Sequence, residues 1–276
     1  MVGALIIVFR EVVEAGLIVG IVLAVTKGLR GSRATIALGV AGGVFGSALV
    51  AVFAGVIATA FEGVGQEVFN ASILLIAVVM LVWHNVWMAS HGRELAVDVR
   101  RVGQEVRAGS RSIAALGVVC AIAVMREGSE IALFMYGLAA SDGSTPAALM
   151  IGSLLGLLAG VGVTALTYLG LLTIPTRNLF LVTTILISLL AAGLASQAVS
   201  FLQQADILSF LTQTAWDTSA YLSEGTLAGR VLHTLVGYSD QPSVLQVVSY
   251  VATLAIIVAL TRSSRLGWRR PLRPAS

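Results

Sequence analysis

Charged residues are scarce in this chain of 276 amino acids. They make up 11% of it, whereas hydrophobic residues make up 57% and the mean hydropathy is +0.95. Because soluble domains carry about 25% charged residues, this composition excludes an ordinary soluble protein and indicates a polytopic membrane protein. The apolar runs have the length of membrane-spanning helices, about 20 residues. We expect helices in these runs, since a helix satisfies its own backbone hydrogen bonds in lipid.

Cysteine is almost absent as well. The single cysteine, Cys120, lies in an apolar run. A disulfide within the chain is therefore excluded, and a thiolate metal cluster is disfavoured. We expect Cys120 to be a small, buried core residue.

The motifs of several enzyme and pump classes are also missing. No phosphate-binding loop, dinucleotide fingerprint or HExxH stretch is present, and no Ser/His/Asp arrangement stands out. We therefore expect no enzymatic activity, with an intramembrane protease as a distant alternative, and no permanently bound cofactor. Without an energy-coupling motif, a carrier or facilitated pathway is preferred to a primary pump. The net charge of +3 reflects basic residues in short loops, so we expect no nucleic-acid partner.

What the sequence does contain is one charged pattern, Arg-Glu-x-x-Glu, in two apolar runs, at residues 10–14 and 126–130. Spacings of three and four place the charged residues of each copy on one helix face. An ionised residue at the bilayer centre costs about 2.5–3.5 kcal/mol, so we expect these faces to point into the protein. If they meet, four carboxylates and two guanidinium groups converge, and the net negative site favours a multivalent cation. The predicted metal ligands are Glu11, Glu14, Glu127 and Glu130, supported by Arg10 and Arg126.

An internal ion-pair lock that only holds two helices together is the alternative interpretation of these motifs. Intramembrane ionisable residues usually mark ion or proton pathways. Two matched copies at similar depth therefore favour a pathway.

The distribution of basic residues predicts the topology. We expect seven spans, at residues 3–25, 35–60, 68–90, 113–140, 147–173, 178–202 and 244–262, in one domain covering residues 1–276. The first run carries charges in its middle, which predicts a retained span and not a cleaved signal peptide. Most basic residues follow spans 1, 3, 5 and 7, so the positive-inside rule places the N-terminus outside and the C-terminus in the cytoplasm.

Spans 2 and 5 resemble each other in their spacing of small residues, just as spans 1 and 4 resemble each other in their charged motifs. Span 2 contains Gly39, Gly42, Gly43 and Gly46, and span 5 contains Gly152, Gly156 and Gly160. Glycine every fourth residue lets helices approach closely. The matched motifs and glycine spacings therefore predict that spans 1–3 and 4–6 form an inverted-topology repeat, with a site at the interface of the two halves. Span 7 is then an addition to this repeat.

Other polar residues are open to two interpretations. Glu62 and Glu67 lie between spans 2 and 3, as first contacts for an incoming cation or as a solvated turn. His84, deep in span 3, is either a ligand near the exit or, preferably, a packing histidine. The loop after span 3 carries the stripe Leu95, Val99, Val102 and Val106, which indicates a short amphipathic helix that lies on the membrane surface or, preferably, is a docked connector. In the outer segment 203–243, Ser223 to Thr226 could open a helix that ends at Gly237.

The paired motifs resemble those of the oxidase-dependent iron permease family, which has fungal high-affinity and bacterial EfeU-type members. The resemblance covers nearly the whole chain. It includes residues 62–67, 83–88, 191–197, 216–217 and 235–242.

This resemblance implies high-affinity iron uptake into the cytoplasm across the inner membrane, with the iron ion as substrate. It implies that Glu11, Glu14, Glu127 and Glu130 handle the metal. It also implies partners on the outer side: a periplasmic or extracellular iron-binding protein with a haem peroxidase, or a ferroxidase.

Carboxylates alone do not single out iron, because hard oxygen ligands also suit manganese or magnesium. A carrier for another divalent cation such as manganese remains an alternative. So does a non-transporting membrane scaffold in which the motifs are ion-pair locks.

Overall fold

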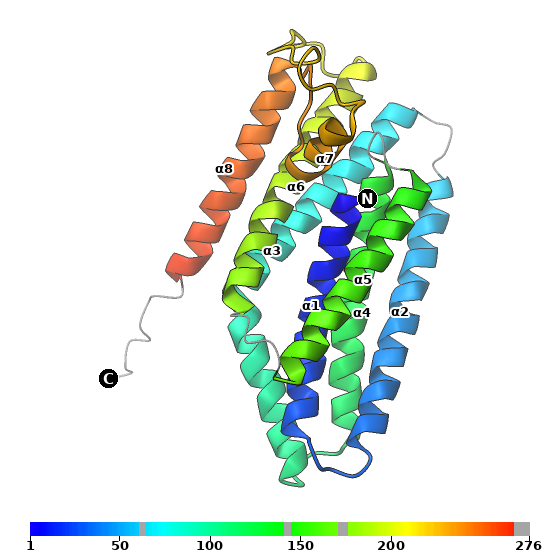
Figure 1. Ribbon diagram of the computed structural model, residues 1–276, viewed down its shortest axis with the longest axis vertical. Helices are drawn as coiled ribbons and strands as arrows, with labels where there is room; N and C mark the ends of the chain where they lie inside the picture. The colour runs from blue at the N-terminus through cyan, green and yellow to red at the C-terminus, as the bar shows by residue number, and fades with distance from the viewer. Residues whose placement is uncertain (61–64, 141–144, 171–175, 268–276) are drawn as a thin grey trace.

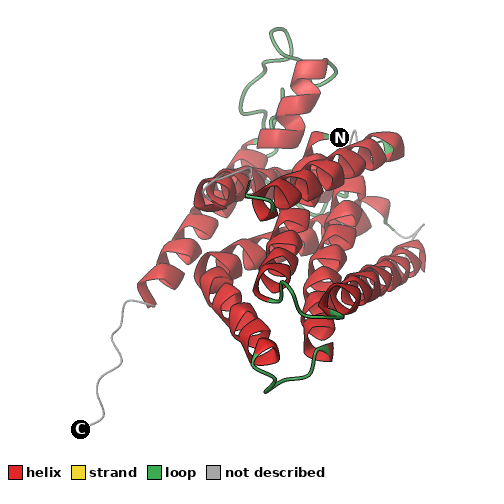
Figure 2. Ribbon diagram, turned by 60° about the horizontal axis from the view of Figure 1, so that its bottom comes forward, coloured by secondary structure: helices red, strands yellow, loops and turns green. Residues whose placement is uncertain are grey.

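The computed structural model describes residues 1–60, 65–140, 145–170 and 176–267. Within these ranges the chain forms helices joined by loops and no β-strand (Figures 1 and 2), which confirms the all-helical prediction there. The helices are α1 (Val2–Val25), α2 (Ser32–Ala60), α3 (Gln66–Arg107), α4 (Ala114–Ala140), α5 (Pro146–Tyr168), α6 (Thr176–Gln204), α7 (Leu227–Val236) and α8 (Val244–Gly267).

Five of these helices contain a segment long and apolar enough to cross a membrane, so the chain is a multi-pass membrane protein. Helices α1 and α4, with 24 and 27 residues, are also long enough to cross a membrane, but each carries the three charged residues of its motif. A helix therefore lies at each position where the sequence predicts a span, and α7 is an additional short helix. The five apolar segments are Ser32–Val56, Glu67–Met88, Pro146–Tyr168, Leu181–Gln204 and Val244–Ser263.

Helix α3 includes the short helix that we expected in the loop after span 3, and it shows where that segment packs. The helix runs without a break from Gln66 to Arg107, so the apolar stripe forms its second half. Val99 and Val106 are buried against α1 and α4, in a cluster that includes Val22 and Cys120. Val99 and Val106 thus cover apolar surface of neighbouring helices, as expected of a docked connector, and the predicted burial of Cys120 is confirmed.

The glycines of α2 and α5 lie where these helices pack most closely, α2 along α4 and α5 along α1. A Cβ added at Gly43 would lie 2.7 Å from both the carbonyl oxygen of Ala121 and the Cβ of Val124. The close approach predicted from glycine spacing is therefore confirmed. Gly42 is an exception, because it faces open space.

The two glycine interfaces share equivalent contacts at Gly43 and Gly156. A Cβ added at Gly156 would meet the Leu5 carbonyl oxygen at 2.5 Å and the Val8 Cβ at 3.0 Å. Leu5 and Val8 precede Glu11 by six and three residues, just as Ala121 and Val124 precede Glu127. Each motif helix thus presents the same backbone surface to its glycine-bearing partner, while α1 and α4 run in opposite directions (Figure 1).

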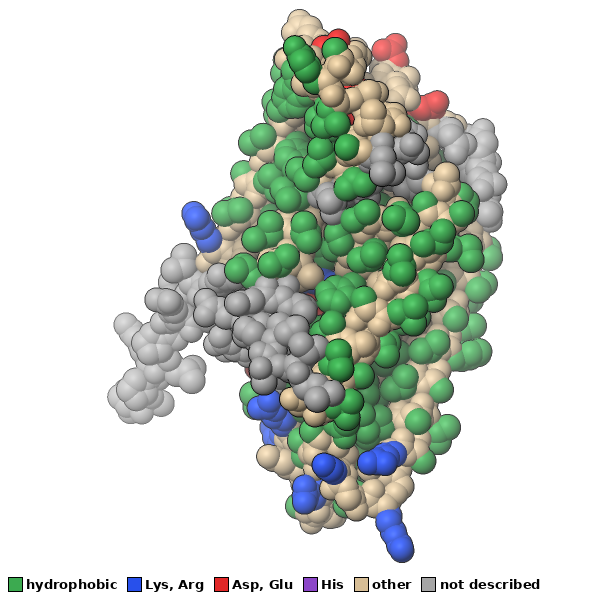
Figure 3. Space-filling view, in the orientation of Figure 1, with side chains coloured by type: hydrophobic (Ala, Val, Ile, Leu, Met, Phe, Trp, Pro, Cys, Tyr) green, Lys and Arg blue, Asp and Glu red, His purple; other side chains and the backbone are tan. Residues whose placement is uncertain are grey.

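The two ends of the molecule differ in charge. Basic side chains gather at the end that holds the connection between α1 and α2, and acidic side chains at the opposite end (Figure 3). Lys27, Arg30 and Arg33 are exposed at the basic end, and Asp206 and Asp217 are exposed in the segment between α6 and α8. This asymmetry is the one that the loop charges predict.

Between α6 and α8 the chain folds back on itself over the acidic end. Helix α7 begins after Thr226, whose hydroxyl accepts a hydrogen bond from the Gly229 amide at 3.0 Å, and it ends at Gly237 in the left-handed conformation, as predicted. The His233 ring beside Glu224 lowers the pKa of that carboxyl. The Ser219 hydroxyl and amide, which donate to Asp217, lower the pKa of that carboxyl too.

Candidate metal-binding site

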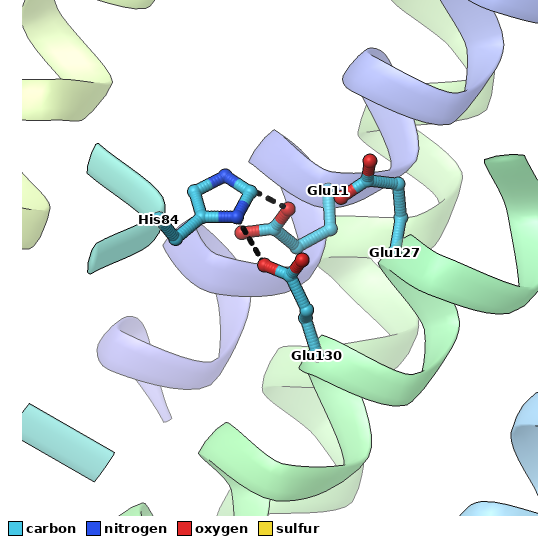
Figure 4. A group of neighbouring side chains, drawn as sticks. All are labelled: Glu11, His84, Glu127 and Glu130. Atoms are coloured by element: carbon cyan, nitrogen blue, oxygen red, sulfur yellow. Dashed lines mark ion pairs between the residues drawn. The ribbon is translucent and has the colours of Figure 1, made fainter. Parts of the chain in front are cut away.

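Side chains from three helices meet at the centre of the bundle. One oxygen from each of Glu11, Glu127 and Glu130 and one ring nitrogen of His84 lie within 4.8 Å of one another. Figure 4 shows the glutamates of α1 and α4 pointing toward each other, with the His84 ring of α3 at their side. The two motif faces therefore do meet, as the sequence predicts.

The first motif is closed off from solvent. Arg10, Glu11 and Glu14 are 1%, 0% and 4% exposed. The Arg10 Nε lies 2.8 Å from Glu14 Oε1, and Arg10 Nη1 lies 3.7 Å from Glu11 Oε1. Burying so many charges is unfavourable unless they are paired, and here one guanidinium compensates two carboxylates.

The second motif repeats this pairing in a more open setting. The Arg126 Nε lies 3.2 Å from Glu130 Oε1 and 3.8 Å from Glu127 Oε1. The side chain of Arg126 is 33% exposed and that of Glu130 16%, whereas Glu127 is buried. The Arg126 guanidinium also stacks over the Trp87 ring of α3, 4.1 Å from its centroid.

His84 joins the two motifs. Its Nδ1 contacts Glu130, and its Nε2 lies 3.5 Å from Glu14 Oε2 and 3.8 Å from Glu11 Oε2. The sequence interpretation placed His84 near an exit or in packing, but the structure places it within the cluster. Its position as the histidine inside an apolar span was the available signal, and nothing in the helical periodicity linked it to the two motifs.

Several buried atoms of the cluster lack a partner of hydrogen-bond geometry within the described residues. They include both oxygens of Glu11, Oε2 of Glu14, Oε2 of Glu127 and Oε2 of Glu130. A buried carboxylate oxygen without a donor is unfavourable. A bound cation is the kind of group that would satisfy all of them together.

The remaining predicted residues lie in different places. Glu14 contacts His84 and Arg10 but is not among the four residues whose donor atoms lie within 4.8 Å of one another. Glu67 is half-buried in the first turn of α3, 17 residues before His84, which is about 25 Å at 1.5 Å per residue. It therefore lies far from the cluster, and Glu62 lies outside the described residues.

Comparisons with known proteins give matches over most of the chain. A sequence model described as "Iron permease FTR1 family" matches residues 1–266. The chain is 30% identical to the ferrous iron permease EfeU of Escherichia coli strain 536, and also to that of Shigella sonnei, over 95% of both chains in each case. It is 31% identical to the Shigella flexneri protein of the same name, over 73% of this chain and 86% of that one. No solved structure matches.

Proposed function

This chain belongs to the iron permease FTR1 family, and from this premise we propose that it imports iron into the cytoplasm through the cluster between α1, α3 and α4. The observation that carries the proposal is the meeting of both motifs around buried carboxylate oxygens that lack a hydrogen-bond partner within the described residues. Glu11, Glu127 and Glu130 bind the ion directly, and Glu14 supports them. The cluster is the substrate site of a transporter and not a catalytic centre.

The electrostatics of the cluster support this proposal. Arg10 and Arg126 each pair with two carboxylates of their own motif, which limits repulsion among the four glutamates. A divalent or trivalent cation replaces part of this compensation, because it lies closer to the carboxylates than a guanidinium can. The arginines then hold the glutamates in place as second partners.

The proposed direction of transport rests on charge asymmetry. We place seven spans in the membrane, with the N-terminus outside and the basic end in the cytoplasm, since basic residues favour the inner side. The acidic outer end raises the local concentration of cations. In this orientation α1 enters from the outside, and we assign the protein to the cytoplasmic (inner) membrane.

An inverted repeat of spans 1–3 and 4–6 is supported by the equivalent contacts of Gly43 and Gly156. Such repeats place the substrate site near mid-membrane, at the interface of the halves. This position of the cluster is supported by Glu11 and Glu127, which come from the first helices of the two halves.

The family resemblance extends the proposal to partners. A periplasmic or extracellular iron-binding protein with a haem peroxidase, or a ferroxidase, would deliver iron to the acidic end. Glu67 lies near that end and is a candidate first contact.

Uptake of radioactive iron into proteoliposomes tests the proposal. Wild type is compared with Glu127→Gln and with Glu94→Gln, a matched control because Glu94 is exposed on α3. We expect uptake to be lost in Glu127→Gln and unchanged in Glu94→Gln. Equal uptake in all three proteins would remove the second motif from the pathway. A loss of folding without a loss of uptake per folded protein would favour ion-pair locks, and competition by manganese stronger than by iron would favour the other-cation alternative.

A further inference from the structure

His84 differs from the other members of the cluster in chemistry and in origin. It supplies the nitrogen donor of the group, and it comes from α3, outside both motifs. It is 3% exposed. His84 therefore offers a donor atom that the repeated pentapeptide does not contain.

The contacts of His84 do not fit a histidine that only fills space. Both ring nitrogens face carboxylates, Nδ1 toward Glu130 and Nε2 toward Glu14 and Glu11. Within the described part of the chain, neither nitrogen has a partner of good hydrogen-bond geometry. A packing histidine is normally fixed by a hydrogen bond to a backbone carbonyl or hydroxyl, and His84 has carboxylates in that place.

The spacing of the donor atoms suits a single ion. In a six-coordinate site with bonds of about 2.1 Å, neighbouring ligand atoms lie about 3 Å apart and opposite ones about 4.2 Å apart. The four donor atoms here lie within 4.8 Å of one another. Small side-chain movements would bring all four onto one cation.

Glu14 has the position of the group that orients a metal-bound histidine. A histidine ligand usually donates its second ring N–H to a carboxylate, which fixes the ring. Glu14 Oε2 lies 3.5 Å from Nε2, and its other oxygen is held by Arg10 at 2.8 Å. This arrangement leaves Nδ1, on the Glu130 side, for the ion, and it explains why Glu14 is not among the four residues whose donor atoms lie within 4.8 Å of one another.

We propose that His84 is a direct ligand of the transported ion and determines its selectivity, with Glu14 and Arg10 as its positioning residues. This inference rests on the proposed function. Carboxylates alone suit magnesium, calcium and manganese, whereas imidazole suits iron and the later transition metals. A site of three carboxylates and one imidazole therefore prefers ferrous iron to magnesium and calcium.

The test is competition of ferrous iron uptake by magnesium and manganese in anaerobic proteoliposomes. His84→Gln replaces the nitrogen donor with an amide of similar size, and His84→Cys restores a softer donor. We expect the preference for iron over magnesium to fall about tenfold or more in His84→Gln, by analogy with lost metal-site partners, and to recover in part in His84→Cys. His233→Gln is the control, since His233 lies on α7, away from the cluster.

A further variant separates a ligand from a counter-ion. His84→Lys keeps a positive charge but offers no neutral nitrogen donor beside the carboxylates. We expect it to lose iron uptake and equilibrium iron binding. Normal uptake in His84→Lys, or an unchanged iron preference in His84→Gln while Glu127→Gln is inactive, would overturn this inference and leave the proposed function standing. A wild-type protein that neither binds nor carries iron would overturn both.

Discussion

The two copies of Arg-Glu-x-x-Glu have the same internal geometry and different surroundings. In both, the arginine Nε pairs with the glutamate four residues on, at 2.8 Å in the first copy and 3.2 Å in the second. Arg10 is enclosed, whereas a third of the Arg126 side chain is exposed and its guanidinium stacks on Trp87. The shared pattern thus fixes the ion pairs, and the neighbouring helices decide which copy is accessible.

The two motifs also differ in which helix contributes the larger side chain to the contact with the neighbouring helix. In the first copy Val12 lies against Gly160 of α5, and in the second Gly128 lies against Ser47 of α2. Val12 and Gly128 hold the same place in the pentapeptide. The larger side chain thus belongs to the motif in one half and to the partner helix in the other, so the two copies are not interchangeable.

Removal of each arginine should give the largest difference between the copies. Arg10→Gln leaves Glu11 and Glu14 buried without their guanidinium, a loss of about 3–5 kcal/mol for a broken buried pair. Arg126→Gln removes a partly exposed partner, for which about 0–1 kcal/mol is typical. Thermal unfolding followed with a thiol-reactive dye would measure both, because Cys120 is the single cysteine and is buried.

That comparison has a clear contrary result. Equal melting temperatures for the two variants would mean that burial does not distinguish the copies. A Lys27→Gln variant serves as the control for loss of a basic residue, since Lys27 is exposed at the basic end.

Variants of Glu14 and Glu130, the last glutamates of the two pentapeptides, should separate a ligand from a positioning residue. We expect Glu130→Gln to abolish saturable iron binding, and Glu14→Gln to weaken it about 10- to 100-fold, the usual effect of losing a group that orients a metal ligand. Equilibrium binding of ferrous iron to the purified protein measures both. Equal losses in the two variants would place Glu14 among the ligands.

These differences mark the limit of prediction from sequence. The convergence of the two motifs was predictable, because buried charges in apolar runs must find each other or a polar pathway. The contribution of His84 was not, since its place opposite Glu11 and Glu130 depends on how α3 crosses α1 and α4. The continuity of α3 was missed for a related reason: the stripe indicated a separate short helix, and the packing of Val99 and Val106 against other helices could not be predicted from it.

Moving the larger side chain from α2 to the motif helix in the second half should have an intermediate effect on the melting temperature. A Cβ at Gly128 would lie 2.6 Å from Ser47 Oγ, so Gly128→Val overpacks the α2–α4 interface, at a typical loss of about 1–3 kcal/mol. Adding Ser47→Gly recreates the Val12 and Gly160 arrangement of the first half and should restore the melting temperature. A double variant no more stable than Gly128→Val would show that the two interfaces are not equivalent in energy.

The smallest expected effect concerns the contact that exists at the second copy, between Arg126 and Trp87. A cation–π contact at a partly exposed site contributes about 0.5–1 kcal/mol, so Trp87→Leu should lower the melting temperature slightly, and Trp87→Phe should lower it less. Trp83→Leu is the matched control, because Trp83 lies on the same helix and is 73% exposed. In a double-mutant cycle with Arg126→Gln, the two losses should not add, since each variant removes the same contact. Additive losses would mean that Trp87 does not stabilise Arg126. The surroundings of Arg126 would then differ from those of Arg10 only in solvent exposure.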